Sequence, residues 1–162
     1  MNPALRGGFV VRAASPADAE GMSRVLGEIV DAGGPERKRD AAHVRGHYIA
    51  HPDRIECSVA LGPEGTILGF QSLKLAVAGN VYGVTPGWGI IGTHVSPAAA
   101  RRGVGKALFA ATRAAAERAG LTDIDATIGA GNATAQSYYE AMGFRDYGDE
   151  PGAARKRYRV GP

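Results

Sequence analysis

The sequence has one cysteine, one tryptophan and no long apolar run. Because Cys57 is alone, no disulfide can form within the chain, which is typical of a protein from a reducing compartment. No stretch approaches the roughly 20 apolar residues of a membrane-spanning helix, and residues 1–8 show no cleavable signal peptide. These absences favour a cytoplasmic protein that does not bind a membrane.

Glycine, in contrast, is abundant. It supplies 24 of the 162 residues, a share about twice the ordinary value of roughly 7%. The glycines have no period of three, so the chain is not collagen-like. Hydrophobic residues make up 44% of the chain and charged residues 22%, which excludes wholesale disorder. The length predicts a single domain over residues 1–162.

Positive charge is concentrated near the C-terminus. The net charge is +3, and the four basic residues Arg155, Lys156, Arg157 and Arg159 follow the last acidic residue, Glu150. Proteins that bind nucleic acid usually spread their basic residues over a face or a helix, so we expect no nucleic-acid partner. The pattern favours a solvated edge strand instead, because lysine and arginine discourage aggregation at strand edges.

Apolar periodicity and Gly/Pro punctuation predict elements in the order βααβββαβαββ. The expected strands are residues 9–12, 55–61, 66–77, 88–95, 124–128, 144–147 and 155–160. The expected helices begin at Pro16, at Asp40, within residues 101–106 and after Asn132, and they end by Gly33, Ala50, Ala119 and Gly143. The strand–helix–strand unit over residues 88–128 indicates a parallel pair joined by a crossover helix. The hairpins on either side indicate antiparallel neighbours, hence a mixed α/β sheet.

The segment Arg101-Arg-Gly-Val-Gly-Lys106 lies between an expected strand and an expected helix. A helix N-terminus presents unpaired amides that suit phosphate oxygens, and Gly103 and Gly105 allow a ligand to approach the backbone. The nucleoside-triphosphate loop is excluded because it needs glycine where Ala100 stands, and the dinucleotide fingerprint needs glycine where Leu108 stands. By itself the segment predicts either an anion site or a plain turn with solvated arginines.

Two longer motifs decide between these readings. Val95-Ser-Pro97 followed by Arg101-Arg-Gly-Val-Gly-Lys-Ala-Leu108 resembles the acetyl-CoA motif [QR]-x-x-G-x-[GA] of the GNAT superfamily of N-acetyltransferases. Asn132-Ala-Thr-Ala135 followed by Tyr138-Tyr-Glu-Ala-Met-Gly-Phe144 is similar to the second signature of that family, N-x-x-A-x-x-x-Y-x-x-x-G-F. The resemblance is strongest over residues 88–147, and before residue 88 it depends on the order of elements alone.

The resemblance implies a single-domain α/β fold with a mixed, mostly antiparallel sheet, a central splayed pair of parallel strands, and helices on both faces. Residues 16–51 would supply the helices of the acceptor site, and residues 86–147 would form the acetyl-CoA-binding core. The implied reaction transfers an acetyl group from acetyl-CoA to a primary amine of a small molecule or a peptide. The family often forms dimers, so a homodimer is also open.

The resemblance also assigns roles to individual residues. The amides of residues 101–106 would hold the CoA pyrophosphate, and Val95 and Asn132 would contact the pantetheine arm. Tyr139 would protonate the leaving thiolate. The implied cofactor-binding residues are Val95, Arg101, Arg102, Gly103, Val104, Gly105, Lys106 and Asn132. The first motif position, Gln or Arg in the family, is Ala100 here, and a neighbouring arginine would have to substitute for it.

The general base is harder to assign. Many members of the family carry a glutamate on the central strand, but Gly89 stands at that place and the strand has no carboxylate. His94 is one candidate, because an ordinary pKa near 6.5 suits a base, although alternation sends it to the face opposite Val95. Asp125, Glu56 or a chain of water molecules are the other candidates.

His43, His47 and His51 recur every four residues. Two histidines four apart on a helix can bind zinc, but the HExxH pattern is absent, and we expect no metal. We interpret the histidines as a polar helix face or as a wall of the acceptor site. Two alternatives to the acetyltransferase remain: a CoA-binding sensor of the same fold without catalysis, and a histidine-based metal protein.

Overall fold

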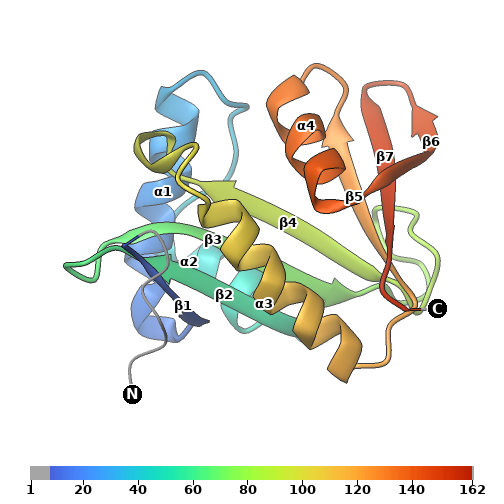
Figure 1. Cartoon of the computed structure of the whole chain (residues 1–162), viewed down its shortest axis with the longest axis horizontal. Helices are drawn as coiled ribbons and strands as arrows, with labels where there is room; N and C mark the ends of the chain where they lie inside the picture. Colours follow the sequence, from blue (N-terminus) through green and yellow to red (C-terminus); the bar gives the residue numbers. More distant parts are fainter. Residues whose placement is uncertain (1–7, 162) are drawn as a thin grey trace.

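The computed structural model describes residues 8–161, in which one mixed sheet lies between two layers of helices (Figure 1). The strand order is β1-β2-β3-β4-β5-β7-β6, and only the β4–β5 pair is parallel. The strands are β1 Val10–Ala13, β2 Arg54–Leu61, β3 Ile67–Leu75, β4 Gly89–Val95, β5 Asp123–Gly129, β6 Arg145–Glu150 and β7 Ala153–Arg159. The predicted order of elements and the mixed sheet are confirmed.

The main helices are α1 Ala19–Asp31, α2 Ala41–Val44, α3 Val104–Arg118 and α4 Ala133–Met142. A 3-10 turn over Pro16–Asp18 leads into α1, and a wider turn over Arg45–Ile49 continues α2. Polar caps set the starts: the Asp40 carboxylate accepts from the His43 amide, and the Asn132 side chain accepts from the Ala135 amide. No helix within residues 8–161 is long and apolar enough to cross a membrane.

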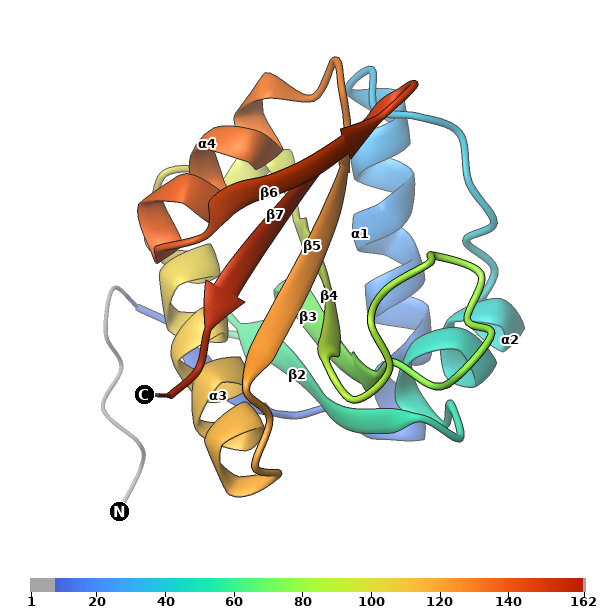
Figure 2. The same ribbon diagram turned by 90° about the vertical axis from the view of Figure 1, so that its right-hand side faces the viewer.

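Helices cover both faces of the sheet (Figure 2), and each face has its own cluster of buried side chains. On one face, α1 and α2 cover the sheet, and Met22, Leu26, Tyr48 and Phe70 are buried there. On the other face, α3 and α4 pack against the sheet through a second cluster. That cluster includes Leu73, Ile91, Phe109, Ile124, Tyr139 and Phe144. The two layers therefore present different side chains to the two sides of the same central strand.

The basic C-terminal segment does not form an edge strand, and that prediction is wrong. β7 lies between β5 and β6, so both of its edges are paired. Lys156 is 2% exposed, and its Nζ lies 2.6 Å from Asp146 Oδ1 and 3.4 Å from Glu140 Oε2. Carboxylates from β6 and α4 compensate its charge, which is why a strand with so many basic residues can lie inside the sheet. Cys57, in contrast, is a buried core residue, as predicted.

The central parallel pair is short and diverges. β4 and β5 share only the register pairs Gly89↔Ile124 and Ile90↔Asp125, and beyond them the strands separate, as Figure 1 shows. β4 stays paired with β3 along its whole length, up to Gly69↔Val95. The second half of β4 therefore has a paired edge toward β3 and an open edge toward β5.

Candidate functional site

The open edge of β4 carries backbone groups that the sheet does not use. The Ser96 amide donates to the Leu68 carbonyl at 2.8 Å, so this residue faces β3. Backbone groups alternate between the two edges of an antiparallel strand, so Thr93 and Val95 direct theirs toward the side where β5 has diverged. An extended ligand lying in that region would find amides and carbonyls at the spacing of a strand.

The N-terminus of α3 lies just after this strand. Gly103 caps the helix with φ +84°, and a Cβ there would meet no atom within 4 Å, so open space lies in front of it. The first intrahelical bond runs from the Ala107 amide to the Gly103 carbonyl, which leaves the amides of Val104, Gly105 and Lys106 without a helical acceptor. Such amides and the helix dipole favour an anion.

The basic residues of the same turn are exposed. Arg101, Arg102 and Lys106 are all accessible, and Arg101 takes a left-handed φ of +64°, which is uncommon for a residue with a side chain. Amides without a helical acceptor, a glycine with open space in front of it and exposed basic side chains together suit an anion such as the phosphate groups of CoA.

Gly105 has a role that the sequence did not reveal. A Cβ at this position would meet Tyr138 Cε1 at 2.6 Å, so the absent side chain makes room for the ring rather than for a ligand. The Tyr138 hydroxyl donates to the Gly105 carbonyl at 2.7 Å and accepts from Gln71 Nε2 at 3.0 Å. Burial raises the pKa of Tyr138 to about 12. Gly105 thus holds α4 close to the first turn of α3.

Tyr139 lies beside the open edge of β4. It is 6% exposed, and its hydroxyl donates to Thr93 Oγ1 at 2.8 Å. Gln71 Nε2 donates to the same threonine oxygen at 2.9 Å, so the phenol is held in one orientation. Burial raises the pKa of Tyr139 well above its ordinary value, and the phenol therefore keeps its proton at neutral pH.

Asn132 begins α4 at the other side of the diverging strands. Its side-chain oxygen accepts from the Ala135 amide at 3.1 Å, and its own backbone amide donates to the Gly129 carbonyl at 2.9 Å. The residue is exposed. Because the oxygen is used by the cap, the side-chain NH₂ group is the part that can donate to a ligand.

His94 lies on the α1/α2 face, opposite Tyr139 and Thr93. Its ring packs 4.8 Å from Phe70 and 5.6 Å from Tyr48, and its Nδ1 lies 3.4 Å from Arg37 Nη1. Burial, with the charges of Arg37 and His47, lowers the pKa of His94 to about 3. A histidine with this pKa is neutral at pH 7 but binds a proton weakly, which is unfavourable for a general base.

The carboxylates considered for the base are already engaged. The oxygens of Asp125 accept hydrogen bonds from the hydroxyls of Tyr147 and Thr127, and Glu56 pairs with Arg118 at 3.5 Å. A Cβ at Gly89 would meet Leu73 Cδ1 at 2.8 Å and Leu121 Cδ1 at 2.9 Å, so a side chain there would require both leucine side chains to shift.

The helix histidines lie next to one basic side chain, Lys74, whose role was not predicted from the sequence. His43 and His47 stack with ring centroids 4.9 Å apart, and Lys74 Nζ lies 3.4 Å from His47 Nε2. Among the described residues, no group of three His, Cys, Asp or Glu side chains could hold a metal ion. Lys74 stands at an inward position of β3, in alternation with Phe70, and that alternation was the signal available in the sequence.

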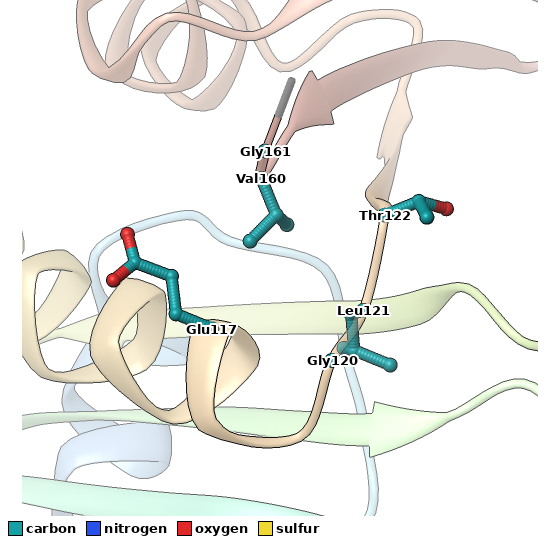
Figure 3. A pocket seen from close by; sticks show the side chains of 6 residues that line it. All are labelled: Glu117, Gly120, Leu121, Thr122, Val160 and Gly161. Carbon is teal, nitrogen blue, oxygen red and sulfur yellow. The ribbon is translucent and has the colours of Figure 1, made fainter.

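Two pockets of the described chain lie elsewhere. Figure 3 shows one of about 230 Å³ at the C-terminal end of α3, lined by Glu117, Gly120, Leu121, Thr122, Val160 and Gly161. The other, of about 270 Å³, is lined by Glu140, Arg145, Asp146 and Lys156. Neither of these two pockets is lined by Tyr139, Val95 or residues 101–106.

Comparisons with known proteins agree with the geometry. Residues 27–144 match the model of the acetyltransferase (GNAT) family. A search among curated proteins gives no significant match. A GCN5-related N-acetyltransferase from Kribbella flavida superposes with a TM-score of 0.78 at 24% identity, over 94% of this chain and 98% of that chain.

Two further solved structures contain the cofactor according to their descriptions. yncA from Salmonella typhimurium, with acetyl-CoA, is 19% identical with a TM-score of 0.75, over 95% of both chains. The paia N-acetyltransferase from Thermoplasma acidophilum, in complex with coenzyme A, is 16% identical with a TM-score of 0.73, over 93% of this chain and 98% of that chain. At these identities the likeness establishes the fold.

Proposed function

Because the chain belongs to the GNAT family and is thus an acetyl-CoA-dependent acetyltransferase, we propose that it transfers the acetyl group to the nitrogen of a primary amine. One observation carries the proposal: the open edge of β4 and the buried hydroxyl of Tyr139 meet at Thr93. The acceptor is a small molecule or a peptide. Residues 86–147 supply the acetyl-CoA site and residues 16–51 the acceptor side of one catalytic domain.

The N-terminus of α3 is proposed to bind the phosphates of acetyl-CoA. The amides of residues 101–106 donate to the pyrophosphate oxygens, and the side chains of Arg101, Arg102 and Lys106 add charge. The pantetheine arm lies along the open edge of β4, where Val95 and the NH₂ group of Asn132 hydrogen bond to it. Binding both substrates in one complex converts the reaction into a near-unimolecular step.

The amine attacks the thioester carbonyl, which forms a C–N bond and a tetrahedral oxyanion. A backbone amide of β4 at Thr93 or Val95 stabilises that oxyanion. The C–S bond then breaks, the electron pair leaves on sulfur, and Tyr139 gives its hydroxyl proton to the thiolate. The phenolate regains a proton from water. The amine loses its own proton to water, because the pKa of His94 is too low for an efficient base.

Turnover of acetyl-CoA with a panel of primary amines, followed as free thiol, tests the proposal. Tyr139→Phe is expected to lower kcat by roughly 10²-fold or more, the usual contribution of a general acid, without weakening CoA binding. Tyr138→Phe is the matched control, because it removes a neighbouring hydroxyl that contacts Gly105 and Gln71. Its main expected effect is on stability, about 1 kcal/mol for one hydrogen bond.

Two outcomes contradict parts of this proposal. Unchanged kcat in Tyr139→Phe would show that another group protonates the thiolate. Tight CoA binding without acetylation of any amine in the panel would favour the non-catalytic sensor.

A further inference from the structure

Six basic side chains gather on the α1/α2 face of the sheet, and we call them the cation cluster. They come from the α1–α2 connection, from α2 and the turn after it, and from β3 and β4. The members are Arg37, His43, His47, His51, Lys74 and His94. The 3.4 Å contact His94–Arg37 forms one group, and the 3.4 Å contact Lys74–His47 with the stacked pair His43–His47 forms a second. The ring of Tyr48 lies between the two groups, 4.6 Å from His47 and 5.6 Å from His94, and the ring of His51 lies 6.2 Å from that of His47.

Lys74 is the buried member of the cluster. The residue is 8% exposed, its Nζ approaches His47 Nε2, and it lies 5.6 Å from the centre of the Tyr48 ring. Among the side chains that the structure describes, its Nζ makes no ion pair with a carboxylate. The burial lowers the pKa of Lys74, while the charge of Asp53 only partly opposes this. A buried ammonium without a carboxylate is costly unless a ligand compensates it.

Arg37 is the second member of the cluster, and it has a buried hydrogen-bond donor without a partner in the described structure. The residue is half-buried, its Nη1 approaches a histidine nitrogen, and the donor without a partner is its Nε. An arginine presents five donors in a planar fork that matches the two oxygens of a carboxylate or phosphonate. Arg37 and Lys74 thus offer two kinds of donor, and no acidic side chain among the described residues occupies either of them.

The cation cluster lies across β4 from the proposed reaction site. Gly92 precedes Thr93 on this strand, and a Cβ at Gly92 would meet Ser72 Oγ at 3.3 Å and His94 Nε2 at 3.7 Å. Because Gly92 has no side chain, this position of β4 leaves space on the α1/α2 face between Lys74 and His94. Thr93, one residue on, holds Tyr139 from the other face. The phosphates of acetyl-CoA are assigned to α3 on that other face, so they do not account for the cluster.

We propose that the cation cluster binds an anionic group, a carboxylate or a phosphonate, of the amine acceptor. The inference rests on the proposed function and narrows its substrate class to amines that carry such a group. The anion accepts from Arg37 and Lys74, and it also makes protonation of His47 and His94 more favourable.

Matched pairs of acceptors test the substrate class. Phenylalanine is compared with phenethylamine, and 2-aminoethylphosphonate with propylamine, each as kcat/KM with saturating acetyl-CoA. The ratio of the acidic to the neutral acceptor is expected to fall about tenfold, or about 1.4 kcal/mol, in Lys74→Met. Arg37→Gln provides a second variant that does not alter the sheet. The control Lys38→Met removes an exposed lysine beside Arg37 and leaves the ratio unchanged.

The inference is overturned if the neutral acceptors are preferred, or if Lys74→Met and Arg37→Gln lower kcat/KM equally for both members of a pair. An equal loss is what a purely structural role would produce.

A binding measurement separates this inference from the proposed reaction. Methylphosphonate is titrated into protein saturated with CoA, which keeps the probe away from the α3 turn, and the imidazole signals are followed by NMR. The signals of His47 and His94 are expected to shift in the native protein and not in Lys74→Met. Shifts without acetylation of any amine would support the anion site and contradict the reaction. Acetylation without shifts would support the reaction and contradict the anion site.

Discussion

Two lysines are buried in this protein, and their surroundings differ. Lys156 on β7 is 2% exposed and has the carboxylates of Asp146 and Glu140 beside it, which raise its pKa. Lys74 on β3 is 8% exposed and has a histidine beside it, and burial lowers its pKa. The first charge has two carboxylates beside it within the fold, whereas the second has a histidine and a tyrosine ring beside it and makes no ion pair among the described side chains.

The comparison distinguishes a charged side chain that stabilises the fold from one that is available to bind a ligand. A buried ion pair that is complete in the free protein holds elements together, as Lys156 does for β6, β7 and α4. A buried cation without a counter-charge lowers stability, and such groups are typical of binding sites. The α1/α2 face is therefore the side of the sheet where we expect recognition of the acceptor.

The largest expected difference between the two regions is their response to acid. The pKa of His47 is lowered to about 4 and that of His94 to about 3, both by burial and neighbouring cations. The unfolded chain, with histidines near 6.5, binds more protons than the native one in this range. Stability therefore rises with pH from about 3 to 6.5, and it is lost as the pH falls through that window.

Urea unfolding at several pH values measures this dependence. The double variant His47→Gln/His94→Gln is expected to flatten the profile between pH 4 and 6.5. His43→Gln is the comparison variant, because it removes a ring that stacks on His47 and leaves both His47 and His94 in place, so it is expected to flatten the profile less. An unchanged profile in the double variant would show that His47 and His94 do not cause the acid sensitivity.

Lys156→Met is expected to have a smaller effect, a loss of about 1–2 kcal/mol in the free energy of unfolding. The substitution removes two charge-assisted hydrogen bonds, each of which contributes about 1.5–3 kcal/mol when buried, but the exposed positions of Asp146 and Glu140 reduce this value. Thermal unfolding should show a decrease of about 2–4 °C per kcal/mol for a chain of this size.

Lys74→Met is expected to have the smallest effect on stability, between no change and a gain of about 1 kcal/mol. Methionine keeps the apolar stem and removes a buried charge that has no carboxylate partner. The same thermal assay, run beside Lys156→Met, gives the comparison directly. A loss as large as that of Lys156→Met would show that Lys74 is compensated within the fold.

The sequence predicted best those features that depend on neighbouring residues. The turn before α3 and the cap of α4 are local, because Gly103 and Asn132 need only their own backbone surroundings. The misassigned edge strand depended on partners that are far away: Lys156 is paired by residues of α4 and β6. No local pattern reports such contacts.

Gly105 and the cation cluster show the same limit. A glycine at position 105 is visible in the sequence, but the ring of Tyr138 that fills its space lies 33 residues further on. Arg37, His47, Lys74 and His94 come from four segments that only the sheet and the α2 region bring together. The acceptor side was therefore predicted only in outline, as helices around residues 16–51.

The short β4–β5 pairing has a mechanical consequence. Two register pairs join a half-sheet of β1 to β4 with a half-sheet of β5, β7 and β6. Contacts between α3 and α4 also connect the two half-sheets, for example the hydrogen bond from the Tyr138 hydroxyl to the Gly105 carbonyl. A molecule that hydrogen bonds to both separated strands would act as a tie between the halves. Occupancy of the site would then hold the two half-sheets together and slow hydrogen exchange in both of them.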